Sequence, residues 1–226
     1  MRLNKFIAHA NGKSRREADD LISAGHAKVN GKIANIGAQV DELNDRITLN
    51  NEKLTLPKKS TLIMLNKPVG YVSSRAAQSR NAKTLYELLP SEFQKLKTVG
   101  RLDKDSSGLI LLTDDGDLAF RMTHPKFSKT KIYEVKLNRT LEPLHQQMIS
   151  DIGIELPDGK SRFLLEKLDD LRISWRIIMS EGRNRQIRRT FAALGYTVVK
   201  LHRTDFGRYK LGNLPAGKWR ELELTD

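Results

Sequence analysis

The sequence predicts an α+β protein made of a small N-terminal domain, residues 1–58, and a larger C-terminal domain, residues 59–226. Two short helical patterns and a hairpin signal fill the first 50 residues, and a polar stretch containing Pro57 follows them. The remaining strand-like and helix-like runs show no regular βαβ alternation, which favours an α+β arrangement over a parallel α/β sheet. With 226 residues, of which 38% are hydrophobic, the chain is long enough for one small and one medium-sized core.

The N-terminal elements follow from local patterns. Apolar residues at positions 3, 6, 7 and 10 share one helix face, and Asn11-Gly12 ends that helix. The segment 14–17, Ser-Arg-Arg-Glu, has the capping-box form and begins a second helix, which Gly25 closes. Residues 28–33 contain an Asn-Gly dipeptide between short apolar runs, which predicts a hairpin, and residues 47–50 predict a closing strand.

Residues 51–60 predict a linker that joins the two domains flexibly, because they are polar and contain a proline. In the larger domain we expect a mixed, mainly antiparallel sheet flanked by helices. Its expected strands lie at residues 62–65, 97–99, 109–112, 131–137, 171–177 and 197–201. Its expected helices lie at residues 84–89, 117–122 (capped by Asp117), 141–148 and 185–194.

The charge balance points to a polyanionic partner. The net charge is +13 and the isoelectric point about 9.9; residues 172–220 alone hold twelve Lys or Arg and two acidic residues. Such an imbalance favours binding to nucleic-acid phosphates over a merely solvated surface, and an anionic membrane is the other candidate. We find no signal peptide and no 18-residue apolar run, so we expect no membrane association and a cytoplasmic location.

Cofactor and metal chemistry have little support in the sequence. The chain has no cysteine, which excludes disulfides, thiolate catalysis and thiolate zinc sites. Its five histidines show no metal-ligand spacing, so we expect neither a metal nor a cofactor. A reducing compartment fits this composition.

The most informative segment is Gly-Arg-Leu-Asp-Lys-Asp-Ser-Ser-Gly-Leu, residues 100–109. It places the carboxylate of Asp103 in a short polar loop between two apolar runs, with Arg101 two residues earlier. Aspartate in a loop is most often a turn former or a helix cap. Within a strongly basic chain, however, a carboxylate presented in this way suggests chemistry on a polyanion.

A calcium loop is the sharper alternative for this segment. Asp103, Asp105, Ser107 and Asp114 fall at positions 1, 3, 5 and 12 of an EF-hand-like spacing. Against it, basic residues flank Asp103, position 12 carries Asp in place of the usual bidentate Glu, and residues 109–112 form an apolar strand run. We therefore favour the catalytic interpretation.

The segment resembles the "GRLD-x-D-[ST]-x-GL" signature of pseudouridine synthases of the RsuA/RluB/RluE/RluF family. Two further segments match family motifs: residues 66–70 match "NKP-x-G", a turn we expect to support the site, and residues 182–189 match "G-[RK]-x-[RH]-Q-[IV]-[RK]-R". A minor departure is Ser106, where threonine is common. The resemblance implies an enzyme that detaches uracil from C1′ of its ribose, rotates it and rejoins it through C5. No redox step and no cofactor are involved.

The resemblance also implies roles for individual residues. Asp103 would be the essential carboxylate, acting either as a nucleophile or as a base. Tyr133 would stack on the target base, although a tyrosine in a β-strand is otherwise unremarkable in function. Arg188 would pair with Asp103 and hold it ionised and oriented, whereas Arg183 and Arg189 fit a solvated helix face better. We also expect RNA contacts from Arg101, Arg15, Arg16, Arg183 and Arg185.

The N-terminal region resembles the S4-like RNA-binding domain over about 45 residues, through "RLNKFIA", "SRREADDLI" and "VNG". Arg15 and Arg16 lie at a predicted helix N-terminus, where backbone amides attract phosphate. The alternative is that both are ordinary solvated helix residues.

The sequence thus predicts a monomeric RNA pseudouridine synthase that acts on ribosomal RNA, with large-subunit RNA favoured over small-subunit RNA and transfer RNA left open. The alternative is a noncatalytic RNA-binding or ribosome-assembly factor that uses the same basic surface. The combination of Asp103, Tyr133 and Arg188 argues against it, because binding alone needs no such carboxylate.

Overall fold

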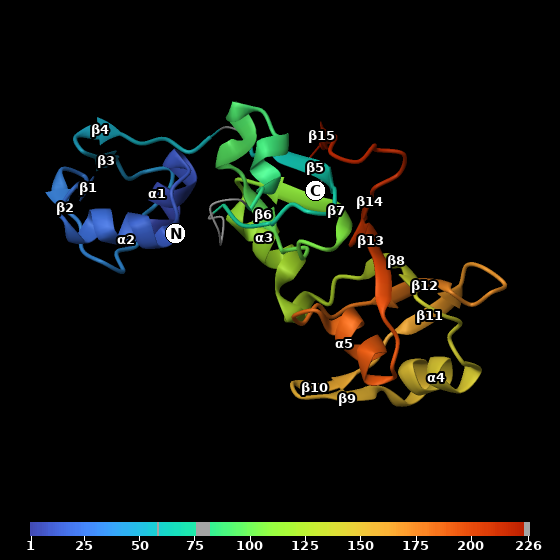
Figure 1. Cartoon of the computed structure of the whole chain (residues 1–226). Coiled ribbons are helices and arrows are strands. Elements are labelled where there is room, and N and C mark those ends of the chain that lie inside the picture. The colour runs from blue at the N-terminus through green and yellow to red at the C-terminus, as the bar shows by residue number, and fades with distance from the viewer. Residues whose placement is uncertain (58, 76–81, 224–226) are drawn as a thin grey trace.

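The computed structural model describes the chain except for residues 58, 76–81 and 224–226. The N-terminal part consists of helices α1 (Leu3–Asn11) and α2 (Arg15–Ser23) and a four-stranded sheet (Figure 1). The sheet has the order β2 (Lys32–Ile33), β1 (Ala27–Val29), β3 (Ile47–Leu49) and β4 (Glu52–Lys53). Side chains from both helices and the sheet form a hydrophobic cluster of their own, which includes Leu3, Phe6, Ile7, Ile22 and Ile47.

Local sequence signals place these elements. The Ser14 hydroxyl accepts a hydrogen bond from the Glu17 amide at 3.2 Å, and the Glu17 carboxylate accepts one from the Ser14 amide at 2.6 Å. This confirms the predicted capping box. Asn30 and Gly31, with φ of 52° and 83°, form the predicted hairpin turn between β1 and β2.

The linker is shorter than the sequence indicated. Residues 52–53 form β4, which pairs antiparallel with β3, so the predicted linker over residues 51–60 is wrong at its start. Asn50 and Asn51 both adopt positive φ and turn the chain back, and Leu54 and Leu56 then pack against the N-terminal cluster. The predicted boundary at residue 58 falls outside the described residues and stays a prediction.

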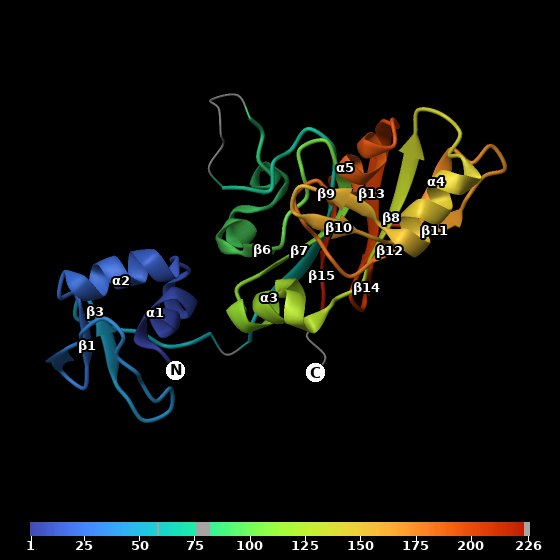
Figure 2. The ribbon, with the colours of Figure 1, turned by 90° about the horizontal axis from the view of Figure 1, so that it is seen from below.

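The C-terminal part is built on a nine-stranded sheet that is mixed and mainly antiparallel, as predicted. The main path runs β11 (Leu164–Lys167), β12 (Ser174–Met179), β8 (Lys131–Leu137), β13 (Val198–Phe206), β7 (Ser107–Thr113), β5 (Leu62–Lys67) and β15 (Trp219–Glu221). Two short strands extend it, β14 (Tyr209–Lys210) beside β13 and β6 (Lys97–Val99) beside β7. A separate hairpin, β9 (Ile154–Leu156) with β10 (Gly159–Ser161), lies next to α5 (Gln186–Ala193) (Figure 2).

The sheet is covered on both faces. Along β7, Ile110 and Leu112 belong to one hydrophobic cluster, which contains Phe191 of α5, while Leu109 and Leu111 belong to another. The second cluster includes side chains of α3 (Gly116–Thr123). This double coverage explains why residues 109–112 read as an unbroken apolar run.

The central strands β7 and β13 approach each other very closely, and they are the parallel pair among the described strands. Gly108 has φ of +107°, and a β-carbon there would lie 2.2 Å from the Arg203 carbonyl oxygen. Glycine is therefore required at this point of the signature, because any side chain would push the two strands apart.

Several predicted elements shift in the structure. The cap of α3 is Asp115, which accepts from the amides of residues 117 and 118, so the predicted Asp117 cap is wrong. The helix expected at residues 84–89 is a 3-10 turn, Leu85–Leu88, and a second such turn follows at Ser91–Lys95. Pro125–Phe127 forms a third. The helix expected at residues 141–148 divides into α4 (Pro143–Gln147) and a π-turn (Met148–Ile152).

Strand boundaries also move, most of all in β12 and β13. β12 begins three residues later than predicted, because Arg172 adopts a positive φ of 56° and turns the chain before the strand starts. β13 continues to Phe206, five residues beyond the predicted end, since its pairing with β8 and β7 extends past the apolar run. The hairpin β9–β10 and the edge strand β15 were not predicted.

Candidate active site

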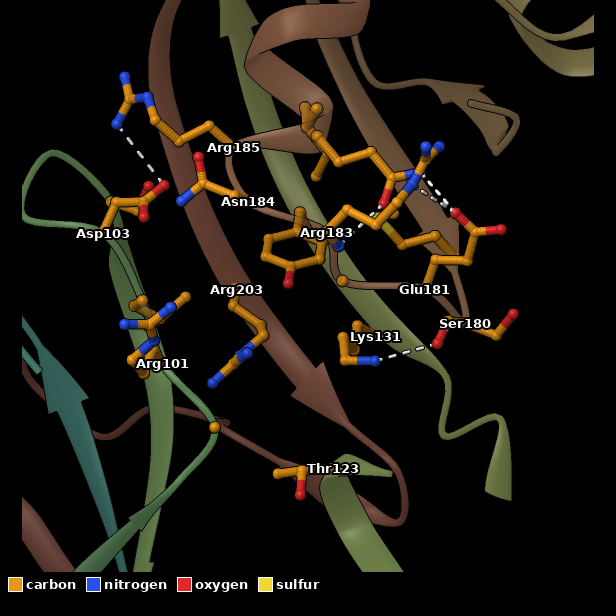
Figure 3. A pocket seen from close by; sticks show the side chains of 18 of the residues that line it. Arg101, Asp103, Thr123, Lys131, Ser180, Glu181, Arg183, Asn184, Arg185 and Arg203 are labelled. Carbon is orange, nitrogen blue, oxygen red and sulfur yellow. Dashed lines mark hydrogen bonds and ion pairs between the residues drawn. The ribbon is translucent and has the colours of Figure 1, made fainter. Parts of the chain in front are cut away.

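A pocket of about 720 Å³ opens where the loop before β7 meets β8, β13 and the segment leading into α5 (Figure 3). Its lining includes Asp103, Tyr133, Arg185 and Arg203. Residues separated by up to 100 positions in the sequence thus share one cavity. The structure therefore brings together the carboxylate and the tyrosine that the sequence had singled out.

The loop carrying Asp103 is anchored on both sides of that residue. Leu102 is buried, its carbonyl oxygen accepts from the Ser73 hydroxyl at 2.7 Å, and its amide donates to the same hydroxyl at 3.1 Å. The Lys104 carbonyl accepts from the Gly70 amide at 2.8 Å. The predicted turn at residues 66–70 thus supports the loop, and the Asp103 side chain, 35% exposed, is left facing the pocket.

Among the described residues, Arg185 is the arginine that forms an ion pair with Asp103. Its guanidinium donates to both carboxylate oxygens of Asp105, at 2.9 and 2.8 Å, and lies 3.6 Å from the Asp103 carboxylate. It precedes α5 with φ of +46°, an uncommon conformation for a residue other than glycine. That backbone turn directs its side chain toward the signature loop rather than along the helix.

The predicted pairing of Arg188 with Asp103 is wrong. The guanidinium of Arg188 donates to the Asp105 carbonyl oxygen at 2.7 Å and to the Val198 carbonyl oxygen at 2.8 Å, and its Nε lies 3.3 Å from the Asp105 carboxylate. The physical reason is position: Arg188 lies within the first turn of α5, so its largely buried side chain reaches the base of the loop. Arg188 therefore ties α5, β13 and the loop together beneath the site.

Asp105 is the electrostatic centre of this cluster, a role that was not predicted from the sequence. The hydrogen bonds from Arg185, together with the charges of Arg188 and Arg185, hold the pKa of Asp105 below its usual value. Burial lowers the pKa of the Arg188 guanidinium, and the charge of Asp105 opposes that effect. The sequence did carry a sign of this role: Asp105 is the second aspartate of the "GRLD-x-D" signature, two residues after Asp103.

Lys67, at the end of β5, is a second residue whose role was missed. Its side chain is completely buried, and its ammonium donates to the carbonyl oxygens of Pro68 at 3.0 Å and Tyr71 at 2.8 Å. Burial lowers its pKa to about 8, and the charges of Asp103 and Asp105 oppose that shift. The site therefore has a buried cation behind its two carboxylates.

Tyr133 lies on β8, opposite Arg203 of β13 and Ile177 of β12. It is 8% exposed and belongs to the larger hydrophobic cluster, yet it also lines the pocket. Packing therefore fixes the ring while part of it faces the cavity. This placement suits an aromatic surface for a flat ligand.

The other arginines that the sequence singled out divide into two groups. Arg101 is exposed at the pocket, and Arg15 and Arg16 are exposed on α2. Arg183 instead donates to the carbonyl oxygens of residues 158, 159 and 160, so its guanidinium holds the β9–β10 turn. Arg189 forms a bidentate ion pair with Asp158, at 3.0 and 2.7 Å, in place of the expected solvated face.

Among the described residues, no three His, Cys, Asp or Glu side chains gather in a way that could hold a metal ion. The calcium-like spacing after Asp103 does not form a loop, because β7 begins at Ser107. None of the described helices is long and apolar enough to cross a membrane.

Comparison with known proteins identifies the family. A sequence model described as RNA pseudouridylate synthase matches residues 61–193, which include the whole carboxylate cluster, and an S4 domain model matches residues 1–47. The chain belongs to the RNA pseudouridine synthases. It is accordingly an isomerase that binds RNA, and the predicted two-part organisation of S4 domain and catalytic fold is confirmed.

Relatives of similar length support this assignment along the whole chain. Ribosomal large subunit pseudouridine synthase B of Bacillus subtilis is 37% identical, covering 98% of this chain and 91% of that protein. Ribosomal small subunit pseudouridine synthase A of Pasteurella multocida is 38% identical, covering 100% and 97%. A crystal structure of a pseudouridylate synthase superimposes with a TM-score of 0.70 at 38% identity, covering 99% of this chain and 96% of that one.

Proposed function

We propose that this pseudouridine synthase modifies one specific uridine of ribosomal RNA, in the large subunit rather than the small, with Asp103 as the essential carboxylate. The observation that carries the catalytic part is the position of Asp103 on an anchored loop, facing a pocket it shares with Tyr133. Relatives named for large-subunit and small-subunit RNA are similarly identical to this chain, so both RNAs belong in the test. Transfer RNA is the remaining candidate substrate.

In the proposed mechanism the target uridine leaves its stack and enters the pocket, because Asp103 cannot reach C1′ inside a duplex. Its base lies against the Tyr133 ring, a contact worth on the order of 1–3 kcal/mol. Asp103 then acts at the C1′ centre as nucleophile or base while the N1–C1′ bond breaks, the uracil turns and a C5–C1′ bond forms. C5 loses its hydrogen and N1 gains a proton, so the reaction is a net isomerisation.

Arg185 and Asp105 orient the reacting carboxylate in this proposal. Asp105 holds the Arg185 guanidinium at two points, and that guanidinium stays 3.6 Å from Asp103. A bidentate pair fixes a planar group more firmly than a point charge would. Asp103 thereby keeps one orientation without losing its exposure to the pocket.

The test is pseudouridine formation in unmodified large-subunit RNA, small-subunit RNA and transfer RNA, mapped by nucleotide position. Asp103→Asn should abolish the product and leave RNA affinity within about twofold, since it removes one charge and almost no volume. Asp170→Asn is the matched control, because the Asp170 carboxylate is fully exposed and does not line the pocket. If Asp103→Asn formed pseudouridine at the wild-type rate, Asp103 would not be the essential carboxylate. If pseudouridine formed only in transfer RNA, the proposed ribosomal RNA substrate would be wrong.

A further inference from the structure

The pocket has a second charged region, at the end opposite Asp103. Figure 3 shows Arg101, Arg203 and Lys131 on the side of the pocket toward Thr123, while Asp103 and Arg185 face each other on the other side. Arg203 comes from β13 and Lys131 from the start of β8. The carboxylate cluster described above makes no hydrogen bond or ion pair with either residue.

Arg203 is a buried cation with incomplete pairing. Its side chain is 2% exposed, its Nε donates to the Leu109 carbonyl at 2.8 Å, and its Nη2 has no hydrogen-bond partner among the described residues. No described carboxylate lies within 4.0 Å of the guanidinium. An uncompensated buried charge is destabilising, so its presence calls for a ligand or another function.

Lys131 adds a second positive charge to the same region. Its ammonium donates only to carbonyl oxygens, those of Lys129 at 3.2 Å and Ser180 at 3.0 Å, in the described part of the chain. Both cations share one aromatic neighbour: the Arg203 guanidinium lies 4.8 Å, and the Lys131 ammonium 5.5 Å, from the centre of the Phe206 ring. Burial is the main cause that lowers the pKa of Lys131 to about 8, and the charge of Arg203 lowers it further. The second effect is expected because the two cations face the same cavity.

We propose that Arg203 and Lys131 form a subsite for one backbone phosphate of the RNA, beside the nucleotide that enters the pocket. The inference rests on the proposed function, because it places that phosphate in the same cavity as the target uridine. A phosphate oxyanion accepts from the free guanidinium nitrogen and from the ammonium, and neutralises two charges with which no described carboxylate forms an ion pair. The Glu181 charge acts on Lys131 but is already paired with Arg183. Arg101, exposed at the rim, extends the positive field toward solvent and attracts the strand.

The geometry also explains why a buried arginine is placed here. The Arg203 backbone is pressed against Gly108 of β7, so the subsite is built on the rigid centre of the sheet. Asp103 follows from the loop that leads into the same strand. A phosphate held at Arg203 therefore has a fixed position relative to the Asp103 carboxylate. Binding of the RNA strand at this point orients the target nucleotide toward Asp103.

The probe is a fluorescein-labelled pentauridylate, whose affinity is measured by anisotropy at several salt concentrations. Lys131→Met should lower the affinity about tenfold at low salt, as expected for a lost charge-assisted contact. It should also make the slope of log K against log salt shallower by about 0.7, the value for one phosphate on a single strand. Lys136→Met is the matched control, since Lys136 lies exposed on the opposite face of β8.

Arg203→Met tests the buried cation directly. If Arg203→Met does not fold, Lys131→Met still tests the subsite, because Lys131 lies nearer the surface. Pentauridylates with a single neutral methylphosphonate linkage then locate the contact. At one linkage the substitution should weaken wild-type binding and leave Lys131→Met binding unchanged. The proposal would be overturned if Lys131→Met and Arg203→Met bound pentauridylate with the same affinity and salt dependence as Lys136→Met. It would also be overturned if a neutral linkage at every position weakened binding to Lys131→Met as much as to the wild type.

The two proposals can fail separately. Pentauridylate binding requires no turnover, so it reports on the subsite even if the protein modifies a different RNA. If the wild-type protein bound a fully neutral methylphosphonate pentauridylate as tightly as the charged one, the subsite proposal would be refuted. The catalytic proposal would be unaffected. A normal affinity with a lost rate in Lys131→Met would likewise contradict it, because the residue would then belong to the chemistry.

Discussion

Lys67 offers a quantitative test of the electrostatics behind the active site. Its side chain has no exposed surface, and its pKa is lowered from 10.5 to about 8 because burial disfavours the charged form. The unfolded chain therefore holds this proton more tightly than the folded one. By linkage, stability should rise with pH between about 8 and 10.5, as the folded protein loses the proton first.

The size of the effect follows from the two pKa values. With 10.5 for the unfolded state and about 8 for the folded state, this group alone should raise the unfolding free energy by about 2 kcal/mol from about pH 7 to 9.5. Lys131, whose pKa is also lowered to about 8, adds a contribution of similar size. Lys67→Met should accordingly remove about half of the combined rise.

The assay is urea unfolding of the wild type, Lys67→Met and Lys136→Met across this pH range. Lys136→Met, an exposed lysine on β8, should keep the full wild-type rise. Asp103→Asn should start the rise at lower pH, because the Asp103 charge is one of the two that favour the protonated lysine. A wild type whose stability does not change, or a Lys67→Met variant with the full rise, would refute the idea of a buried cation behind the carboxylates.

Three further predictions test other contacts. Gly108→Ala should destabilise the protein by about 3 kcal/mol or more in urea unfolding, because the new β-carbon would meet the β13 backbone and φ is positive; a loss below about 1 kcal/mol would contradict the close approach. Arg188→Lys should lower the turnover rate by about ten- to a hundredfold in single-turnover assays, since lysine cannot span both carbonyl oxygens. Arg189→Lys should change that rate little, and equal losses would point to a shared phosphate role. Replacing Arg15 and Arg16 with alanine should weaken RNA binding and reduce its salt dependence while leaving single-turnover rates at saturating short substrate unchanged; a collapse of turnover at unchanged affinity would place both residues in the catalytic site.

Local rules predicted the elements whose signals lie within a few residues. The capping box before α2, the Asn-Gly turn and the α5 pattern ending at Gly195 all depend on contacts between near neighbours, and each is present. Elements defined by pairing with distant strands were missed or shifted. β15 is a strand because it meets β5, some 150 residues earlier. β4 was missed for a different reason: it pairs with the adjacent β3 through the turn at Asn50 and Asn51.

The sequence by itself determined the family, the position of Asp103 in a short polar loop and the basic character of the chain, since these depend on residue order and composition alone. Only the tertiary structure decided which charges meet. The sequence favoured Arg188 as the partner of Asp103. In the structure the left-handed turn at Arg185 brings that residue to Asp103 instead, and the largely buried Arg188 side chain reaches Asp105. Lys67 belongs to the segment that matches "NKP-x-G", but the motif does not record that its ammonium is buried, and Arg203 lies outside the matched motifs. Burial and pairing are properties of long-range packing, and no local pattern records which side chains the fold will bring within hydrogen-bonding distance.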